Sequence, residues 1–190
     1  MDPASVRAIA AESIALKQRF FDENAELLVE IGRHMAQCLR AGGKVLTFGN
    51  GGSASDAQHL ACELVGRFAR DRPGMAALAL TTDPSVMTAV GNDFGFAEVF
   101  RRQVEAHGRP GDVAVGITTS GRSANVVDAL RLAREKGLLT VGLTGGGGGR
   151  LCGLVHYLVD VPHDQTQRIQ EVHGMVVHVL CQVVEDAVFP

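Results

Sequence analysis

The chain has 190 residues, 46% of them hydrophobic, and a formal net charge of -3 at pH 7. This length suits one compact domain over residues 1–190, and without any run of Lys or Arg we expect no nucleic acid partner. Charged residues interrupt the N-terminal segment, so it lacks the apolar core of a signal peptide, and no apolar run is long enough to cross a membrane.

Residues 4–40 come first and carry apolar side chains at roughly helical spacing, with Gly42 and Gly43 closing the segment. The pattern predicts two helices in sequence, an N-terminal helical pair over residues 1–42. Residues 43–190 then form an α/β core. The four cysteines of the chain are scattered without a CxxC pair, which favours a reducing, cytoplasmic setting over a disulfide framework; they are Cys38, Cys62, Cys152 and Cys181.

Five short apolar runs alternate with helix-length segments in the α/β core. This alternation is typical of a parallel sheet with helices on both faces, so we expect a three-layer α/β sandwich with a five-stranded parallel sheet. The expected strands are residues 44–49, 76–80, 112–118, 138–144 and 155–161. A run of five glycines at 145–149 stands where the fourth strand should lead into a helix.

The last segment, residues 166–189, is apolar over most of its circumference. A helix of this kind must be covered on more than one side. We infer that subunits pack together and share this helix and the N-terminal pair. The alternative is a helix that is buried within one subunit.

The first polar loop, GNGGSAS at 49–55, follows a strand and opens a helix, where backbone N–H groups and the helix dipole can hold an anion. Gly49, Gly51 and Ala54 also satisfy a G-x-G-x-x-A dinucleotide fingerprint. That pattern requires an acidic residue at the end of the next strand, about 20 positions further on, and the nearest candidate there, Asp83, lies far beyond. We therefore expect a phosphate site and no nucleotide cofactor.

The second polar loop, TTSGRSAN at 118–125, brackets one glycine with hydroxyl side chains just before a helix. Hydroxyls and backbone amides can hold a phosphate monoester without a metal or a lysine. An ordinary serine-rich helix cap is the alternative. The carboxyl end of a central strand, where this loop should lie, is where ligands bind in open α/β sheets, and this favours phosphate.

His59 and Glu63 stand four residues apart on the helix that follows the first loop, so they share one face. Such a pair can share a metal or a proton, although exposed pairs at this spacing are common. Gln170, Gly174 and His178 follow one another at the same spacing on the last helix. A glycine inside a helix costs roughly 1 kcal/mol relative to alanine, so either a ligand or close helix packing should explain Gly174.

The two loops together resemble the sugar isomerase (SIS) fold, a flavodoxin-like, Rossmann-like arrangement that binds phosphosugars. Further stretches resemble its phosphoheptose isomerase branch over nearly the whole chain. They are GNDFGF at 91–96, GRPGDV at 108–113, REKG at 134–137 and RIQEVHGMVVH at 168–178.

The resemblance implies that Glu63 and His178 form the acid/base pair. It implies zinc as the cofactor, held by His59, Glu63, Gln170 and His178. The substrate-binding residues that it implies are Asn50, Gly51, Gly52, Ser53, Glu63, Asn92, Asp93, Thr118, Thr119, Ser120, Ser123 and Gln170, with Arg67 and Thr166 as weaker candidates.

The implied activity is the aldose–ketose isomerisation of sedoheptulose 7-phosphate through an enediolate, in a homotetramer that supplies heptose for a bacterial envelope. A proton must move between adjacent carbons while a second group serves the oxygens. The alternative is a non-catalytic SIS-domain regulator that binds the replication initiator protein. The retained Glu63 and His178 favour the enzyme, and His173, which projects from a different face of its helix, is interpreted as structural.

Overall fold

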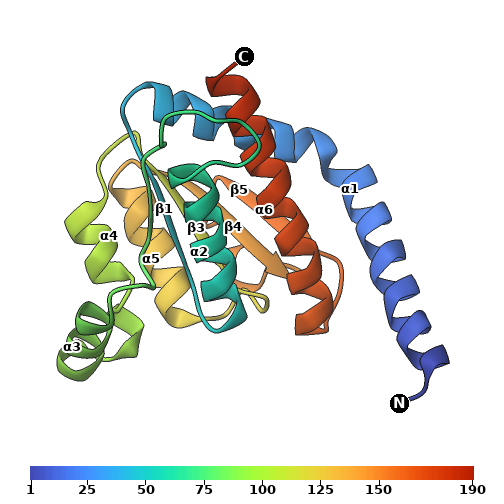
Figure 1. The fold of residues 1–190 in the computed structure, drawn as a ribbon. Helices are drawn as coiled ribbons and strands as arrows, with labels where there is room; N and C mark the ends of the chain where they lie inside the picture. The colour runs from blue at the N-terminus through green and yellow to red at the C-terminus, as the bar shows by residue number, and fades with distance from the viewer.

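The computed structural model describes residues 1–190 and contains a five-stranded parallel sheet between two layers of helices (Figure 1). The strands are β1 (Val45–Gly49), β2 (Ala77–Ala79), β3 (Val113–Ile117), β4 (Leu139–Gly145) and β5 (Tyr157–Val161), in the order β2-β1-β3-β4-β5. The prediction of five parallel strands in an α/β sandwich is confirmed. The α-helices are α1 (Pro3–Arg40), α2 (Gly52–Val65), α3 (Pro84–Phe94), α4 (Arg101–His107), α5 (Ala124–Glu135) and α6 (Thr166–Val188), with short 3₁₀ turns at Phe96–Glu98 and Gly149–Leu151.

Alternate residues of the strands face two separate cores, because side chains along a strand point to opposite sides of the sheet. Val45 packs with buried residues of α1, α2 and α6, whereas Leu46 and Phe48 pack with residues of α4 and α5. The helices α1, α2 and α6 therefore cover one face of the sheet, and α4 and α5 cover the other.

The N-terminal segment is one helix of 38 residues, so the prediction of a helical pair over residues 1–42 is wrong. Its start is fixed by Asp2, whose carboxylate accepts a hydrogen bond from the backbone N–H of Ser5. No glycine or proline interrupts the hydrogen-bond ladder between Pro3 and Gly32, so the segment stays helical throughout. Figure 1 shows that α1 changes direction along its length, and its N-terminal half projects from the body of the molecule.

Helix α6 confirms the expected C-terminal helix, and most of its apolar side chains are covered within one subunit, whereas Met175 is 43% exposed. Ile169, Val176 and Leu180 are buried in the core that α6 shares with α1 and α2. The pattern therefore fits the alternative of burial inside one subunit, and it does not by itself require a neighbour. None of the helices is long and apolar enough to span a membrane.

Candidate active site

The two polar loops meet where the sheet changes its winding direction. Strands β1 and β3 are neighbours, yet α2 and α5, the helices that follow their loops, cover opposite faces of the sheet. A crevice opens at such a switch point, beyond the carboxyl ends of the strands. The loop after β1 and the loop after β3 line this crevice together.

A cavity of about 300 Å³ occupies the crevice and collects most of the predicted substrate-binding residues. None of its lining residues carries a charge. They are Asn50, Gly51, Gly52, Ser53, Ile117, Thr118, Thr119, Ser120, Ser123, Thr166 and Gln170. The structure thus places the two loops and the start of α6 around one cavity, as the sequence predicted. Thr166, one of the weaker candidates, also lines this cavity.

The first loop needs glycine at its entrance because two backbone segments pass close to it. A Cβ atom on Gly49 would lie 2.7 Å from the carbonyl oxygen of Ser53 and 2.8 Å from that of Ile117. Gly51, with φ at +57°, takes a left-handed conformation that favours glycine. This turn starts α2 at the cavity, which Gly52 and Ser53 line, and the positive end of the helix dipole favours an anion there.

Gln170 reaches across the cavity from α6 toward the first loop. A Cβ atom on Gly52 would overlap the amide of Gln170. The missing side chain at Gly52 therefore makes the room in which Gln170 lies, and this places an amide of the last helix directly over the N-terminus of α2.

Asn125 joins the two loops, and the sequence reasoning missed it. The amide of Asn125 and that of Asn50 donate to each other, with both nitrogen–oxygen distances 2.9 Å. Asn125 is buried, and the hydroxyls of Thr118 and Ser123 lie 3.0 Å apart beside it. A polar residue in the first turn of a helix after a phosphate loop was the available signal.

The reactive side chains form a second group, further along α2 and α6. The Nε2 atoms of His59 and His178 lie 3.1 Å apart, and Nε2 of His59 lies 3.4 Å from Oε1 of Glu63. The ring of Phe68 packs beside His178, with centroids 5.7 Å apart. The structure therefore brings His59, Glu63 and His178 together, with His59 between the two predicted acid/base residues.

The reactive group and the cavity lie along the same two helices. Gly52 and His59 are seven residues apart on α2, which is about 10 Å along a helix axis. On α6, Gly174 lies between Gln170 and His178, and a Cβ atom there would contact no atom within 4 Å. Close helix packing within the subunit therefore does not explain this glycine, and room for a ligand stays the prediction.

Asp56 stands one turn before His59 on α2 and is a partly buried carboxyl group. Its Oδ2 atom is buried without a hydrogen-bond partner. Burial raises the pKa of Asp56, while the nearby His59 acts in the opposite direction. This environment leaves Asp56 easier to protonate than an exposed carboxylate.

Apart from Glu63, which belongs to the reactive group, three predicted contacts do not line the cavity. Asn92 and Asp93 lie exposed on α3, where the amide of Asn92 donates to the carboxylate of Asp93 at 2.8 Å. Arg67 lies exposed just beyond α2. Their roles in binding stay predictions, and for Arg67 the expected route is across a subunit boundary.

The donor atoms fit a zinc ion in part. The edge of a tetrahedron of ligands around zinc is about 3.3 Å, from zinc–nitrogen distances of about 2.0 to 2.1 Å. The His59–His178 distance of 3.1 Å and the His59–Glu63 distance of 3.4 Å both come near this value. However, no three His, Cys, Asp or Glu side chains converge on one point.

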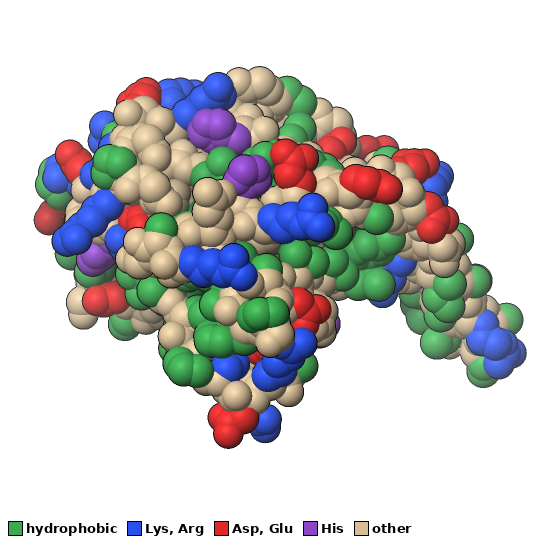
Figure 2. Space-filling model, turned by 90° about the horizontal axis from the view of Figure 1, so that it is seen from above, with side chains coloured by type: hydrophobic (Ala, Val, Ile, Leu, Met, Phe, Trp, Pro, Cys, Tyr) green, Lys and Arg blue, Asp and Glu red, His purple; other side chains and the backbone are tan.

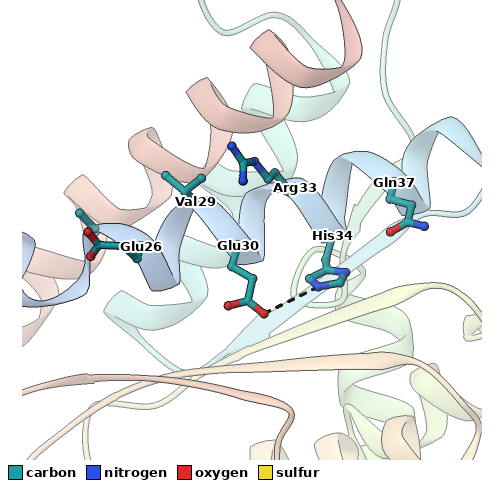
Figure 3. Close-up of a pocket in the computed structure, with 7 residues that line it drawn as sticks. Glu26, Val29, Glu30, Arg33, His34 and Gln37 are labelled. Carbon is teal, nitrogen blue, oxygen red and sulfur yellow. Dashed lines mark ion pairs between the residues drawn. The ribbon is translucent and has the colours of Figure 1, made fainter.

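A larger hollow of about 590 Å³ lies elsewhere, along α1 (Figure 3). All of its lining residues belong to this helix; they are Ala25, Glu26, Val29, Glu30, Arg33, His34 and Gln37. The hollow is therefore the outer surface of one helix and not a cleft between elements. It carries none of the predicted site residues.

Comparisons with known proteins identify the family of the chain. The SIS domain family matches residues 10–145. The chain is 53% identical over 180 residues to the phosphoheptose isomerase of Nitratidesulfovibrio vulgaris, which covers 95% of this chain and 86% of that protein. The solved phosphoheptose isomerase of Neisseria gonorrhoeae superimposes with a TM-score of 0.91 at 46% identity, over 96% of this chain and 98% of that one. The Francisella tularensis phosphoheptose isomerase gives 0.92 at 36% identity, over 96% and 97%. The chain therefore belongs to the SIS domain family, among the phosphoheptose isomerases.

Proposed function

We propose that this chain is an aldose–ketose isomerase that converts sedoheptulose 7-phosphate to D-glycero-D-manno-heptose 7-phosphate. The observation that carries the proposal is the pairing of an anion cavity with a separate His–Glu–His group on the same two helices. The family supplies the substrate class, since the relatives are phosphoheptose isomerases.

The phosphate end of the sugar would bind in the cavity between the loops. Its lining offers neutral hydroxyls, amides and backbone N–H groups, with helices α2 and α5 beginning there. Such donors hold a phosphate by directed hydrogen bonds and by the helix dipoles. The spacing of about 10 Å along α2 leaves room for the carbon chain to reach from the phosphate to His59 and Glu63.

The proton transfers would divide between Glu63 and His178. The carboxylate of Glu63 would take a proton from C1 of the ketose and return it to C2, through an enediolate. His178 would move the proton on the sugar oxygens, from O1 to O2. Because the cavity fixes the far end of the sugar, the reacting carbons would stay in register with Glu63.

Zinc binding is part of the proposal, with His59, Glu63, Gln170 and His178 as the residues that would hold the ion. Imidazole nitrogen and carboxylate oxygen are ordinary zinc ligands, whereas an amide oxygen is a weak one. When bound, zinc would polarise the sugar oxygens as a Lewis acid. Equilibrium dialysis with zinc should show one ion per chain, and the variant His59→Ala should bind less than half as much. Equal binding by both proteins would contradict these ligands.

A turnover assay tests the function. Purified protein should convert sedoheptulose 7-phosphate to the aldose, measured by chromatography of the sugar phosphates. The variants Glu63→Gln and His178→Gln should lose at least about 100-fold in kcat, because each removes a group that transfers a proton. Circular dichroism should show that both still fold. Absence of turnover by the wild type, with or without added zinc, would favour the non-catalytic regulator.

We further propose that the enzyme is a homotetramer, in line with the expectation from its resemblance. The exposed apolar residues of the projecting half of α1 support an assembly. Location in the cytoplasm stays a prediction of the cysteine pattern.

A further inference from the structure

Glu185 is a fully buried carboxylate near the end of α6, seven residues after His178. It accepts hydrogen bonds from three consecutive backbone amides of the segment after α2, at 3.3 Å from Phe68, 2.9 Å from Ala69 and 3.0 Å from Arg70. Burial would raise the pKa of Glu185, but these bonds and the Arg72 guanidinium outweigh it and hold the pKa below its usual range. The carboxylate is therefore ionised at neutral pH.

Arg72 connects this carboxylate with the end of α2. Its side chain is 2% exposed, and its Nε atom donates to Glu185 at 2.9 Å. The two terminal nitrogens donate to the backbone carbonyls of Glu63, at 2.7 Å, and Leu64, at 2.8 Å. Carbonyls in the last turn of a helix have no partner within it, and a cation there also complements the helix dipole.

Glu185 is linked to both members of the acid/base pair. Arg72, which donates to Glu185, also donates to the backbone carbonyl of Glu63. Phe68, whose backbone N–H donates to Glu185, packs its ring against His178. Figure 1 shows the chain after α2 passing beside the C-terminal half of α6, where these contacts form.

A buried ion pair is a poor way to gain stability alone. Removing two charges from water is costly, and apolar side chains of equal volume often stabilise a fold as well or better. A planar guanidinium that binds one carboxylate and two carbonyls at fixed angles does, however, define geometry well. The pair is thus better explained by the alignment that it imposes on α2 and α6.

We propose that Arg72 and Glu185 are positioning residues that hold Glu63 and His178 in register for proton transfer. The proposal rests on the isomerase function proposed above. Neither residue lines the phosphate cavity, so their effect should fall on the reacting end of the sugar.

The test compares Arg72→Lys and Glu185→Gln with the wild type. Lysine keeps the charge but cannot contact Glu185 and both carbonyls in one arrangement. Glutamine keeps the shape of Glu185 but loses its charge. We expect kcat to fall about 10- to 100-fold in each variant, while KM changes less than threefold, because displaced reactive groups slow the chemistry and leave phosphate binding intact. Rates are to be measured at least 15 °C below the melting temperature of each variant, so that a lower rate does not reflect unfolded protein.

Asp186→Asn provides the matched control. Asp186 follows Glu185 and pairs with Arg70 of the same segment at 2.8 Å, but both side chains are about half exposed, at 50% and 45%. Exposed pairs contribute little, so this variant should keep the wild-type kcat and KM. A loss of melting temperature with unchanged kcat in Arg72→Lys, the milder change, would overturn the proposal and leave the pair a structural one.

A second readout does not depend on turnover. The ring-proton NMR signals of His59 and His178, recorded at one fixed pH, should shift in Arg72→Lys and stay in place in Asp186→Asn. Unshifted signals in Arg72→Lys would overturn the positioning role. A wild type without turnover whose ring signals still respond to Arg72→Lys would instead count against the isomerase function alone.

Discussion

His173 is a buried histidine that the fold keeps neutral. It is 0% exposed, its Nε2–H donates to the carbonyl of Thr144 at 3.1 Å, and its Nδ1 atom is buried without a partner. Burial lowers the pKa of His173 from 6.5 to about 4, although the bond to Thr144 acts in the opposite direction. The interpretation of His173 as structural agrees with this burial.

This histidine should make stability depend on pH. Between pH 6.5 and about 4 the unfolded chain binds the proton and the folded chain does not. The free energy of unfolding should therefore be complete above pH 6.5 and fall as the pH drops toward 4, by on the order of 3 kcal/mol. Urea unfolding at fixed protein concentration, at pH 7.5 and 5.0, should show about 2 kcal/mol of this loss, because pH 5.0 still lies above the folded pKa of about 4.

The control variant for this pH dependence is His173→Gln, because the glutamine amide can donate to the Thr144 carbonyl but does not titrate. Its unfolding free energy should fall less between the two pH values, because the other titrating groups are common to both proteins. An identical fall in both proteins would show that His173 does not carry the effect.

Asn125 should tighten substrate binding through Asn50. Truncation to alanine leaves the Asn50 amide without its partner, at a cost of about 1 to 2 kcal/mol. We expect Asn125→Ala to raise KM for the sugar phosphate about tenfold, with a smaller change in kcat, since the reactive group lies further along α2. Steady-state kinetics measures both constants.

Gln58→Ala is the control for Asn125, because the Gln58 amide bonds to the exposed hydroxyl of Thr81 outside the cavity. It should leave KM unchanged. A normal KM in Asn125→Ala would mean that Asn50 holds its position without help.

At the scale of elements, the strands were predictable because each is a short apolar run between helix-length segments. Both polar loops were predictable for the same reason, since they follow strands and open helices. The length of α1 was not predictable, because the apolar periodicity of residues 4–40 is the same for one long helix and for two helices in sequence. The contacts of Arg72 with Glu185 were also out of reach, because they join residues 113 positions apart.

Substitution by alanine should change the free energy of unfolding in opposite directions at two glycines that lie inside helices. A Cβ atom on Gly32 of α1 would lie 2.5 Å from Cγ1 of Val183 on α6, whereas one on Gly174 would meet nothing within 4 Å. Gly32→Ala should cost about 1 to 3 kcal/mol, because it forces the crossing of α1 and α6 apart. Gly174→Ala should gain up to about 1 kcal/mol from helix propensity.

The activities of the two glycine variants should also differ. Gly174→Ala narrows the space between Gln170 and His178, so kcat/KM should drop about tenfold or more in a more stable protein. Gly32→Ala should keep its kcat/KM at temperatures where it is folded. Thermal melts and steady-state kinetics check both, and full activity in Gly174→Ala would show that the sugar does not use this space.

At the scale of the whole molecule, the projecting half of α1 has too little contact with the body to explain its apolar side chains. Val6 is 56% exposed, Ile9 39% and Ile14 67%. Figure 2 shows hydrophobic side chains along this projecting arm. Further along α1, the hollow of Figure 3 carries both acidic and basic groups, including Glu30 beside His34 at 4.0 Å. A surface with both signs can complement a second copy of itself about a two-fold axis.

Substitution of these apolar side chains should therefore weaken the assembly. Burying an aliphatic side chain of this size is worth about 1.5 to 3 kcal/mol, and every subunit of a symmetric oligomer contributes the same contact. Light scattering should find the wild type as a tetramer and the double variant Val6→Glu, Ile14→Glu as a smaller species. Arg7→Glu, an exposed polar change on the same half of α1, should leave the mass unchanged. The cavity and the His59–Glu63–His178 group belong to one subunit, and only the predicted contact of Arg67 would be lost, so the smaller species should keep measurable turnover. A monomeric wild type would contradict the assembly.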